Sequence, residues 1–174
     1  MRSTMVSAAL CGIMVLGSQA RAQAPPAPAS APVPEVMPYV IPYGAPIGID
    51  RAKQVAAAIV AEAKRHANWK EAIAVVGPAG ELIYFEKMDD TQLASIAIAQ
   101  HKARVSATYR RPTQSFEEVI NGGGPATLTL DGVIASRGGL PLVEAGKLIG
   151  AVGCSGGTAA QDLVMCQAGA ALIK

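Results

Sequence analysis

The chain has 174 residues and a formal net charge of +2, and its first 24 residues contain Arg2 and Arg21 but no acid. The remainder carries 13 basic and 13 acidic residues, so no basic face is left that would indicate a nucleic-acid interface. The two histidines and two cysteines of this remainder do not have the spacing of a zinc motif.

Residues 1–24, MRSTMVSAALCGIMVLGSQARAQA, have the pattern of a cleaved signal peptide. A charged start is followed by a short apolar stretch and an A-x-A site. That stretch is too short to span a bilayer, and a buried N-terminal helix would fit the A-x-A ending and the following prolines poorly. We therefore expect an exported protein, periplasmic or secreted, with no membrane segment after cleavage.

Residues 25–46 contain eight of the 12 prolines and form a predicted linker or arm. Met37, Tyr39, Val40, Ile41 and Tyr43 make its second half apolar. Two interpretations stay open: this half lies on a protein surface such as a neighbouring subunit, or the whole segment is a disordered tether.

Residues 47–174 are long enough for a single hydrophobic core, and we expect one domain there. Apolar periodicities and turn residues predict a helix after the N-cap Asp50, further helices and two hairpins. In chain order the elements are a helix from about 51 to 66, strands at 72–76 and 81–85, helices at 93–108 and 115–120, strands at 141–144 and 147–153, and a helix at 159–173. Because hairpins pair antiparallel strands, the expected fold class is α+β, with helices packed on a mainly antiparallel sheet.

Cys154 and Cys166 remain after signal cleavage. A disulfide between them is chemically allowed in an oxidising compartment. We favour two small buried apolar residues instead, since a turn and a helix give no guarantee that the two side chains meet. No C-x-x-C-H motif is present, which excludes covalent haem attachment.

The stretch GAVGCSGGTAAQD, residues 150–162, joins a predicted strand to the last helix. It lacks the Gly-Lys-Ser/Thr of a Walker A loop and the G-x-G-x-x-G pattern. Gly156 and Gly157 permit close backbone approach, and the N–H groups of the following helix suit an anionic group such as a carboxylate. Asp162 lies in the first turn of that helix. A purely structural turn and a ligand site that includes Ser155, Gly156, Gly157 and Asp162 both stay open.

His101 lies on an apolar stripe of the helix at 93–108. Two interpretations stay open: a hydrogen-bonded histidine of the core, or a histidine that contacts a ligand. Lys102, Arg104, Arg110 and Arg111 make this region basic, which suits acidic ligand groups or a solvated face. H-E-x-x-H is absent, and Ser155, in the G-x-S-x-G match at residues 153–157, has no assigned histidine partner. No residue is assigned a catalytic role.

The stretches IAVVGPAGELIYFEKMDD, AIAQHKARVSATYRRPT and GGLPLVEAGKLIGAVGCSGGTAAQD together resemble the GlcG/HbpS family (the DUF336 family), which is related to the C-terminal domain of the PduO adenosyltransferase. The resemblance covers residues 47–174. It implies a profilin-like α/β/α sandwich around a sheet of about five strands, and homo-oligomers built from dimers. It also implies non-covalent haem binding in some members, and haem degradation or redox sensing in a few. The sequence departs from the family pattern at Gly77, where an acid is usual, and at Val105, which replaces a threonine; Thr108 and Thr113 are the nearest substitutes.

On this resemblance, the first hypothesis is an exported haem-binding protein rather than a dedicated enzyme. The haem plane would rest on the small-residue helix near a subunit interface, with Lys102, Arg110 and Arg111 at the propionates and His101 or Tyr109 at the iron. The second hypothesis is an accessory or assembly protein for an exported redox protein, acting through the proline-rich arm. The third is an enzyme that acts on a small metabolite at the glycine turn and Asp162.

Overall fold

The central element of the fold is a four-stranded antiparallel sheet in the order β2-β1-β4-β3. Its strands are β1 (Ala72–Val76), β2 (Leu82–Lys87), β3 (Gly139–Glu144) and β4 (Lys147–Ser155). The computed structural model describes residues 32–174, so the predicted signal peptide and the first residues of the arm lie outside the described residues. The two hairpins pair β1 with β2 and β3 with β4, as the sequence predicts, and β1 pairs with β4 to join them.

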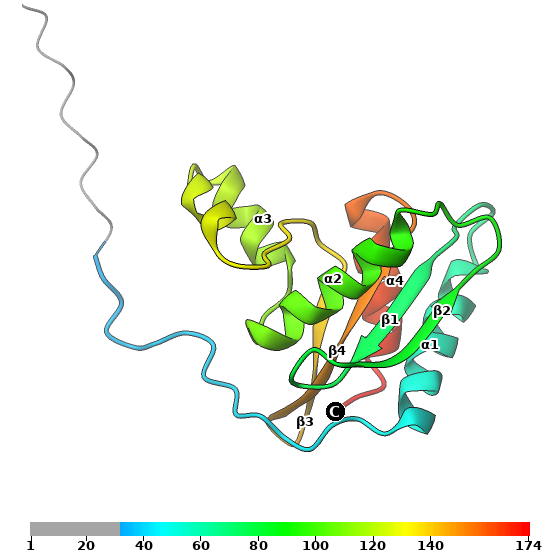
Figure 1. Ribbon diagram of the computed structural model, residues 1–174, viewed down its shortest axis with the longest axis horizontal. Coiled ribbons are helices and arrows are strands. Elements are labelled where there is room, and N and C mark those ends of the chain that lie inside the picture. The colour runs from blue at the N-terminus through cyan, green and yellow to red at the C-terminus, as the bar shows by residue number, and fades with distance from the viewer. Residues whose placement is uncertain (1–31) are drawn as a thin grey trace, which may run out of the picture. The chain divides into compact units, whose positions relative to one another are not determined.

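Helices cover both faces of this sheet, which confirms the expected α+β sandwich (Figure 1). On one face lie α1 (Ile49–Ala63) and α4 (Ala159–Ala170), packed against each other, and on the other lies α2 (Ser95–Thr108). Every residue of β1 is buried because the strand has a helix layer on each side. The short helices α3 (Gln114–Asn121) and η1 (Pro125–Thr129) form an excursion beyond the end of α2 (Figure 1).

The face of α2 that meets the sheet is built from small residues. Ala99, Ala103 and Ala107 pack against alanines and a valine of β1 and β4. At Gly153 an added Cβ would come within 2.6 Å of the Ala103 nitrogen and still closer to the carbonyl of Ala99, so helix and strand nearly touch there. The small side chains therefore let the helix pack directly on the sheet, which closes this inward face of α2 to a ligand.

Several element boundaries differ from those expected. The first helix begins at Ile49 after the extended residue Gly48, which places Asp50 in the first turn instead of at the N-cap. There its charge still favours the helix dipole. The last helix ends at Ala170 rather than 173, and its start is fixed by a capping box between Thr158 and Gln161.

The second half of the arm lies against its own domain. The backbone of residues 42–44 pairs with Leu148 of β4 in a single parallel bridge. This bridge is isolated and adds no strand, and the sheet has four strands rather than about five. Further along, the guanidinium of Arg110 donates to the Ile41 carbonyl, and that of Arg111 lies 4.2 Å from the centre of the Tyr39 ring. From Tyr39 onward, the arm is therefore not a disordered tether.

Cys154 and Cys166 form a disulfide with 5.7 Å between their Cα atoms, so the expectation of two free cysteines is wrong. After the glycine turn, α4 runs back along β4, and this brings its second turn level with the end of that strand. The bond staples the last strand to the last helix.

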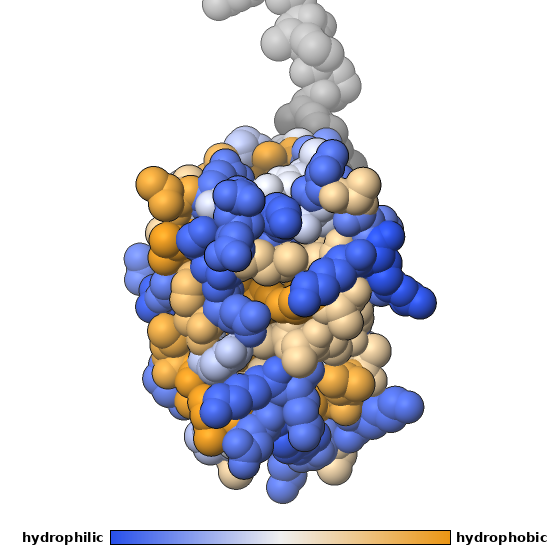
Figure 2. Space-filling view, turned by 90° about the vertical axis from the view of Figure 1, so that its right-hand side faces the viewer, coloured by the Kyte–Doolittle hydropathy of each residue, from blue (hydrophilic) through white to orange (hydrophobic). Residues whose placement is uncertain are grey.

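The surface over α1, β2 and the loop after β2 is mostly polar, with a narrow apolar strip between the charged side chains (Figure 2). Within residues 32–174, no helix combines the length and hydropathy that a membrane crossing requires.

Candidate functional site

The outward face of α2 lines an open pocket of about 510 Å³. Its helical residues are spaced three and four apart, so they project from one face of the helix. They are His101, Arg104, Val105, Thr108 and Tyr109, and Asp131 and Gly132 form the opposite wall. The structure therefore unites three of the predicted cofactor-binding residues, His101, Thr108 and Tyr109, in one cavity.

The loop after η1 is held to this face by two hydrogen bonds. His101 Nε2 donates to the Gly132 carbonyl at 2.6 Å, and the Tyr109 hydroxyl donates to the Asp131 carbonyl at 2.7 Å. The first bond assigns the proton to Nε2, because a carbonyl oxygen only accepts, and leaves Nδ1 free to accept. Sequence spacing alone could not have found this loop, which lies more than 20 residues from the helix.

The pocket continues past Thr108 toward the arm. Thr108 also lines a neighbouring cavity of about 380 Å³ with Tyr43, Pro78 and Ala79. The hydroxyl of Tyr43 donates to the Thr108 carbonyl at 3.1 Å, whereas the hydroxyl of Thr108 is engaged with the Arg104 carbonyl of its own helix. Thr108 therefore contributes a methyl group to this surface more than a free hydroxyl.

Lys102, the residue after His101, points into the protein instead. Its ammonium lies 2.6 Å from Asp162 Oδ2 and 3.1 Å from the Cys154 carbonyl, and the side chain is 1% exposed. The expectation that Lys102 meets a ligand carboxylate is therefore wrong. The guanidinium groups of Arg110 and Arg111 are engaged by the arm, and Arg104 is the cation that lines the pocket.

Thr113 also has a structural role in this chain. Its hydroxyl donates to the Ser136 carbonyl at 2.7 Å and accepts from the Gly139 amide at 2.9 Å, and the residue is buried. It fixes the start of β3 to the start of α3 and does not line the α2 pocket.

The glycine turn holds an anion that belongs to the protein itself. The amides of Gly156 and Gly157 donate to Asp162 Oδ1 at 3.1 and 3.0 Å. Ser155 is buried and donates to the hydroxyl of Ser95 at 3.0 Å. The structure thus brings the four predicted ligand-binding residues together, but the amides expected to face a ligand already serve the carboxylate that pairs with Lys102.

Glu71, which no sequence pattern singled out, completes this buried cluster. The residue is 0% exposed, and its carboxyl oxygens make no hydrogen bond of good geometry within the described chain, although the Ser155 backbone and the Asp162 carboxylate lie beside them. Burial first, and then the Asp162 carboxylate beside it, raise the pKa of Glu71 to about 9 against the opposing charge of Lys102. Glu71 is therefore protonated at neutral pH. The only sequence signal was an acid directly before an apolar run, which normally marks an exposed strand end.

Among residues 32–174 no group of three or more His, Cys, Asp or Glu side chains is placed to hold a metal ion. The chemistry that the α2 pocket offers is an imidazole, a phenol and a guanidinium beside an apolar wall.

Comparisons with known proteins place this fold and sequence in a family. The family model described as haem degrading protein HbpS-like matches residues 47–171. The protein GlcG of Escherichia coli K12 is 40% identical over 107 residues, which are 60% of this chain and 80% of that protein.

Two solved structures have the same fold. The Klebsiella pneumoniae protein ORFY, of the DUF336 family, superposes with a TM-score of 0.69 at 25% identity and covers 81% of this chain and 96% of its own. The PduOC:heme complex superposes with a TM-score of 0.66 at 26% identity and covers 74% and 96%. Since the family model covers well over half of the residues, the chain belongs to the HbpS-like family, as the three stretches quoted above had indicated.

Proposed function

We propose that this protein binds haem non-covalently in the α2 pocket. The observation that carries the proposal is the convergence of His101, Tyr109 and Arg104 on one open face of one helix. Membership of the HbpS-like family and the likeness to a solved haem complex support the same ligand.

The side chains of the pocket fit this group. Imidazole and phenolate are both used as axial ligands of haem iron, and guanidinium suits a propionate. Val105 and the methyl group of Thr108 offer an apolar wall to the ring. Haem, when bound, would supply an iron centre for redox or oxygen chemistry.

Two of the side chains that could contact haem are already hydrogen-bonded within the protein. His101 Nε2 and the Tyr109 hydroxyl are hydrogen-bonded to the carbonyls of Gly132 and Asp131, so a ligand that takes either of these two atoms must displace the loop that carries the carbonyls. Arg104 is exposed and needs no such release. Binding through His101 Nε2 or the Tyr109 hydroxyl should therefore be accompanied by movement of residues 130–133.

The test is a titration of the purified mature protein with haemin, followed by absorbance. We expect a shift of the Soret band that saturates at one haem for each α2 pocket. No shift at stoichiometric haemin would overturn the proposal. Incubation of the loaded protein with a reductant and oxygen then separates storage, in which the Soret band persists, from degradation, in which it is lost.

We also propose that the protein works in the periplasm or outside the cell. The buried Cys154–Cys166 disulfide supports this, because such bonds persist in oxidising compartments and are rare in the cytosol. It joins the predicted signal peptide as a second, independent indication. A tagged full-length chain should appear in the periplasmic or culture fraction, and a version without residues 1–24 should stay in the cytosol; equal distribution of both would contradict export.

A second candidate function, that of an accessory protein for an exported redox protein, draws on the arm. Val36, Met37 and Val40 are between 68% and 78% exposed, an unusual row of apolar side chains. Native co-purification with and without residues 25–38 tests it, since residues 42–44 must stay to pair with β4. Loss of a specific partner from the variant without residues 25–38 supports this function. If the deletion instead halves the mass of the protein's own oligomer, the exposed apolar side chains serve self-association.

A further inference from the structure

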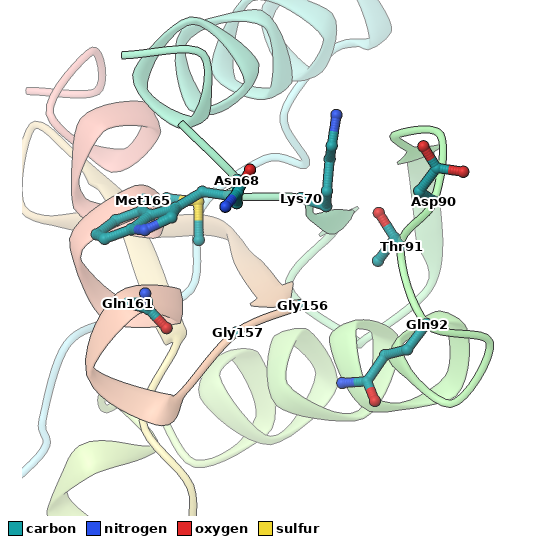
Figure 3. Close-up of a pocket in the computed structure, with 10 residues that line it drawn as sticks. Asn68, Lys70, Asp90, Thr91, Gln92, Gly156, Gly157, Gln161 and Met165 are labelled. Atoms are coloured by element: carbon teal, nitrogen blue, oxygen red, sulfur yellow. The ribbon is translucent and has the colours of Figure 1, made fainter. Parts of the chain in front are cut away.

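A second pocket, of about 300 Å³, lies at the end of the sheet where β1 begins and β4 ends. Its walls come from four separate segments: residues 68–70 before β1, residues 90–92 after β2, the glycine turn, and the first turns of α4. Figure 3 shows Gln161 and Met165 on one side and Thr91 and Gln92 on the other, with Gly156 and Gly157 between them. None of its lining residues belongs to the α2 pocket.

The side chains around this pocket are polar and largely unengaged. Within the described residues, no hydrogen bond or ion pair involves the side chains of Asn68, Asp90 or Gln92. Gln161 uses its amide oxygen to cap α4, and its NH₂ group remains available. Asp90 adopts a φ of 63°, a left-handed conformation that asparagine and aspartate adopt more readily than most residues. Together these groups offer amide donors, amide acceptors and one carboxylate to a ligand.

An aromatic ring forms part of the same wall. Trp69, the single tryptophan of the chain, stacks on His66 with 3.7 Å between ring centroids and 14° between planes. This stacking holds the indole in place without occupying the pocket. A fixed indole presents a flat apolar surface against which the C–H face of a ligand packs.

The pocket has no net charge to neutralise. At its rim Lys70 and Asp90 carry opposite charges, and beneath the glycine turn Lys102 balances Asp162. Directly below Gly156 lies the buried carboxyl group of Glu71, whose Oε1 would be only 2.9 Å from a Cβ at that position. A ligand with a strong net charge would gain no excess of opposite charge here, whereas a neutral one would find many hydrogen-bonding groups.

We propose that this pocket binds a neutral polyhydroxylated molecule of about the size of a monosaccharide. Hydroxyl groups both donate and accept, which matches a set of planar amides beside a carboxylate. The C–H face of such a molecule packs on an indole, and a cavity of this volume lies at the small end of ligand pockets. The site is independent of the haem pocket, so either proposal can fail alone.

The intrinsic fluorescence of Trp69 is a direct probe, because no other tryptophan contributes. We would titrate the mature protein with glucose, galactose and mannose, each to about 50 mM, and with glycine betaine and succinate as zwitterionic and dianionic comparators. The expected result is a saturable change with at least one sugar and none with the two charged compounds. Free N-acetyl-tryptophanamide corrects for solvent effects.

Two variants assign the response to the pocket. Asp90→Asn and Gln92→Ala alter exposed side chains and should weaken sugar binding about tenfold each with an unchanged melting temperature. The first replaces a charged acceptor oxygen by an NH₂ donor, and the second removes an amide that meets the ligand. Gln114→Ala, on α3, is the matched control and should bind as the parent does. The proposal is overturned if none of the three sugars gives a saturable response, if only a charged compound does, or if both pocket variants bind as the control does.

Discussion

His101 and Lys102 are neighbours in sequence and have opposite surroundings. His101 faces outward, bonded to a loop carbonyl at the rim of an open pocket, whereas Lys102 is 1% exposed and paired with Asp162 at 2.6 Å. On the inner face of α2, the charged groups meet one another. On the outer face, Arg104 makes only an exposed hydrogen bond to its own helix and no ion pair among the described residues. The inner face thus has the chemistry of a stabilising cluster, and the outer face has that of a binding surface.

The largest effect should follow removal of the inner cation. Lys102→Met keeps the length of the side chain but leaves the Asp162 carboxylate buried without its partner. Breaking a buried pair in this way costs about 3–5 kcal/mol of unfolding free energy, measured by urea denaturation. Arg104→Ala, on the outer face, is the control. A loss below about 1 kcal/mol for Lys102→Met would show that the cluster does not stabilise the fold.

Removal of the disulfide is the next largest change. The double variant Cys154→Ala, Cys166→Ala removes a cross-link between residues 12 positions apart. It should lower the free energy of unfolding by about 2–4 kcal/mol, because the unfolded chain gains conformational entropy. Thermal melts of the parent with and without reductant should show the same loss. Equal melting temperatures for parent and variant would mean that the bond adds nothing to the stability of the fold.

The Glu71 carboxyl group, unlike Lys102 and the disulfide, should lower the stability of the fold at neutral pH. The folded protein holds its proton up to a pH of about 9, whereas the unfolded chain loses it near pH 4.5, the ordinary value for a glutamate. Between these values the folded state binds more protons, so the free energy of unfolding falls as the pH rises from about 4.5 to about 9.

Glu71→Gln removes that titration, and at pH 7 it should stabilise the protein by about 1–3 kcal/mol and flatten the pH dependence. Urea denaturation at a series of pH values measures both. Destabilisation across the whole range would instead show that the carboxyl group itself is needed where it lies.

The smallest effect on stability is expected on the outer face. Arg104→Ala should change the unfolding free energy by no more than about 0.5 kcal/mol, because the side chain is exposed. It should nevertheless weaken haemin binding about threefold to tenfold and reduce its dependence on salt. Unchanged affinity at low salt would remove Arg104 from the site.

Local patterns predicted the outer face better than the inner one. The spacing of His101, Thr108 and Tyr109 follows from helical periodicity, and both hairpins follow from their turn residues. The burial of Lys102 and its pairing with Asp162 could not be predicted, because Asp162 is 60 residues away and is reached only after the sheet has formed. Glu71 was missed for the same reason: its burial depends on β4 and α4, not on its neighbours in sequence.

The chain contains only two histidines, and comparing their variants tests the central claim, that the haem site is the outer face of α2. Haemin titrations of His101→Ala and His66→Ala measure it directly. His101→Ala should fold normally, bind haemin at least about tenfold more weakly and shift the Soret band, because an iron ligand is lost. His66→Ala should bind as the parent does. Equal binding by both variants, or a loss confined to His66→Ala, would contradict the account.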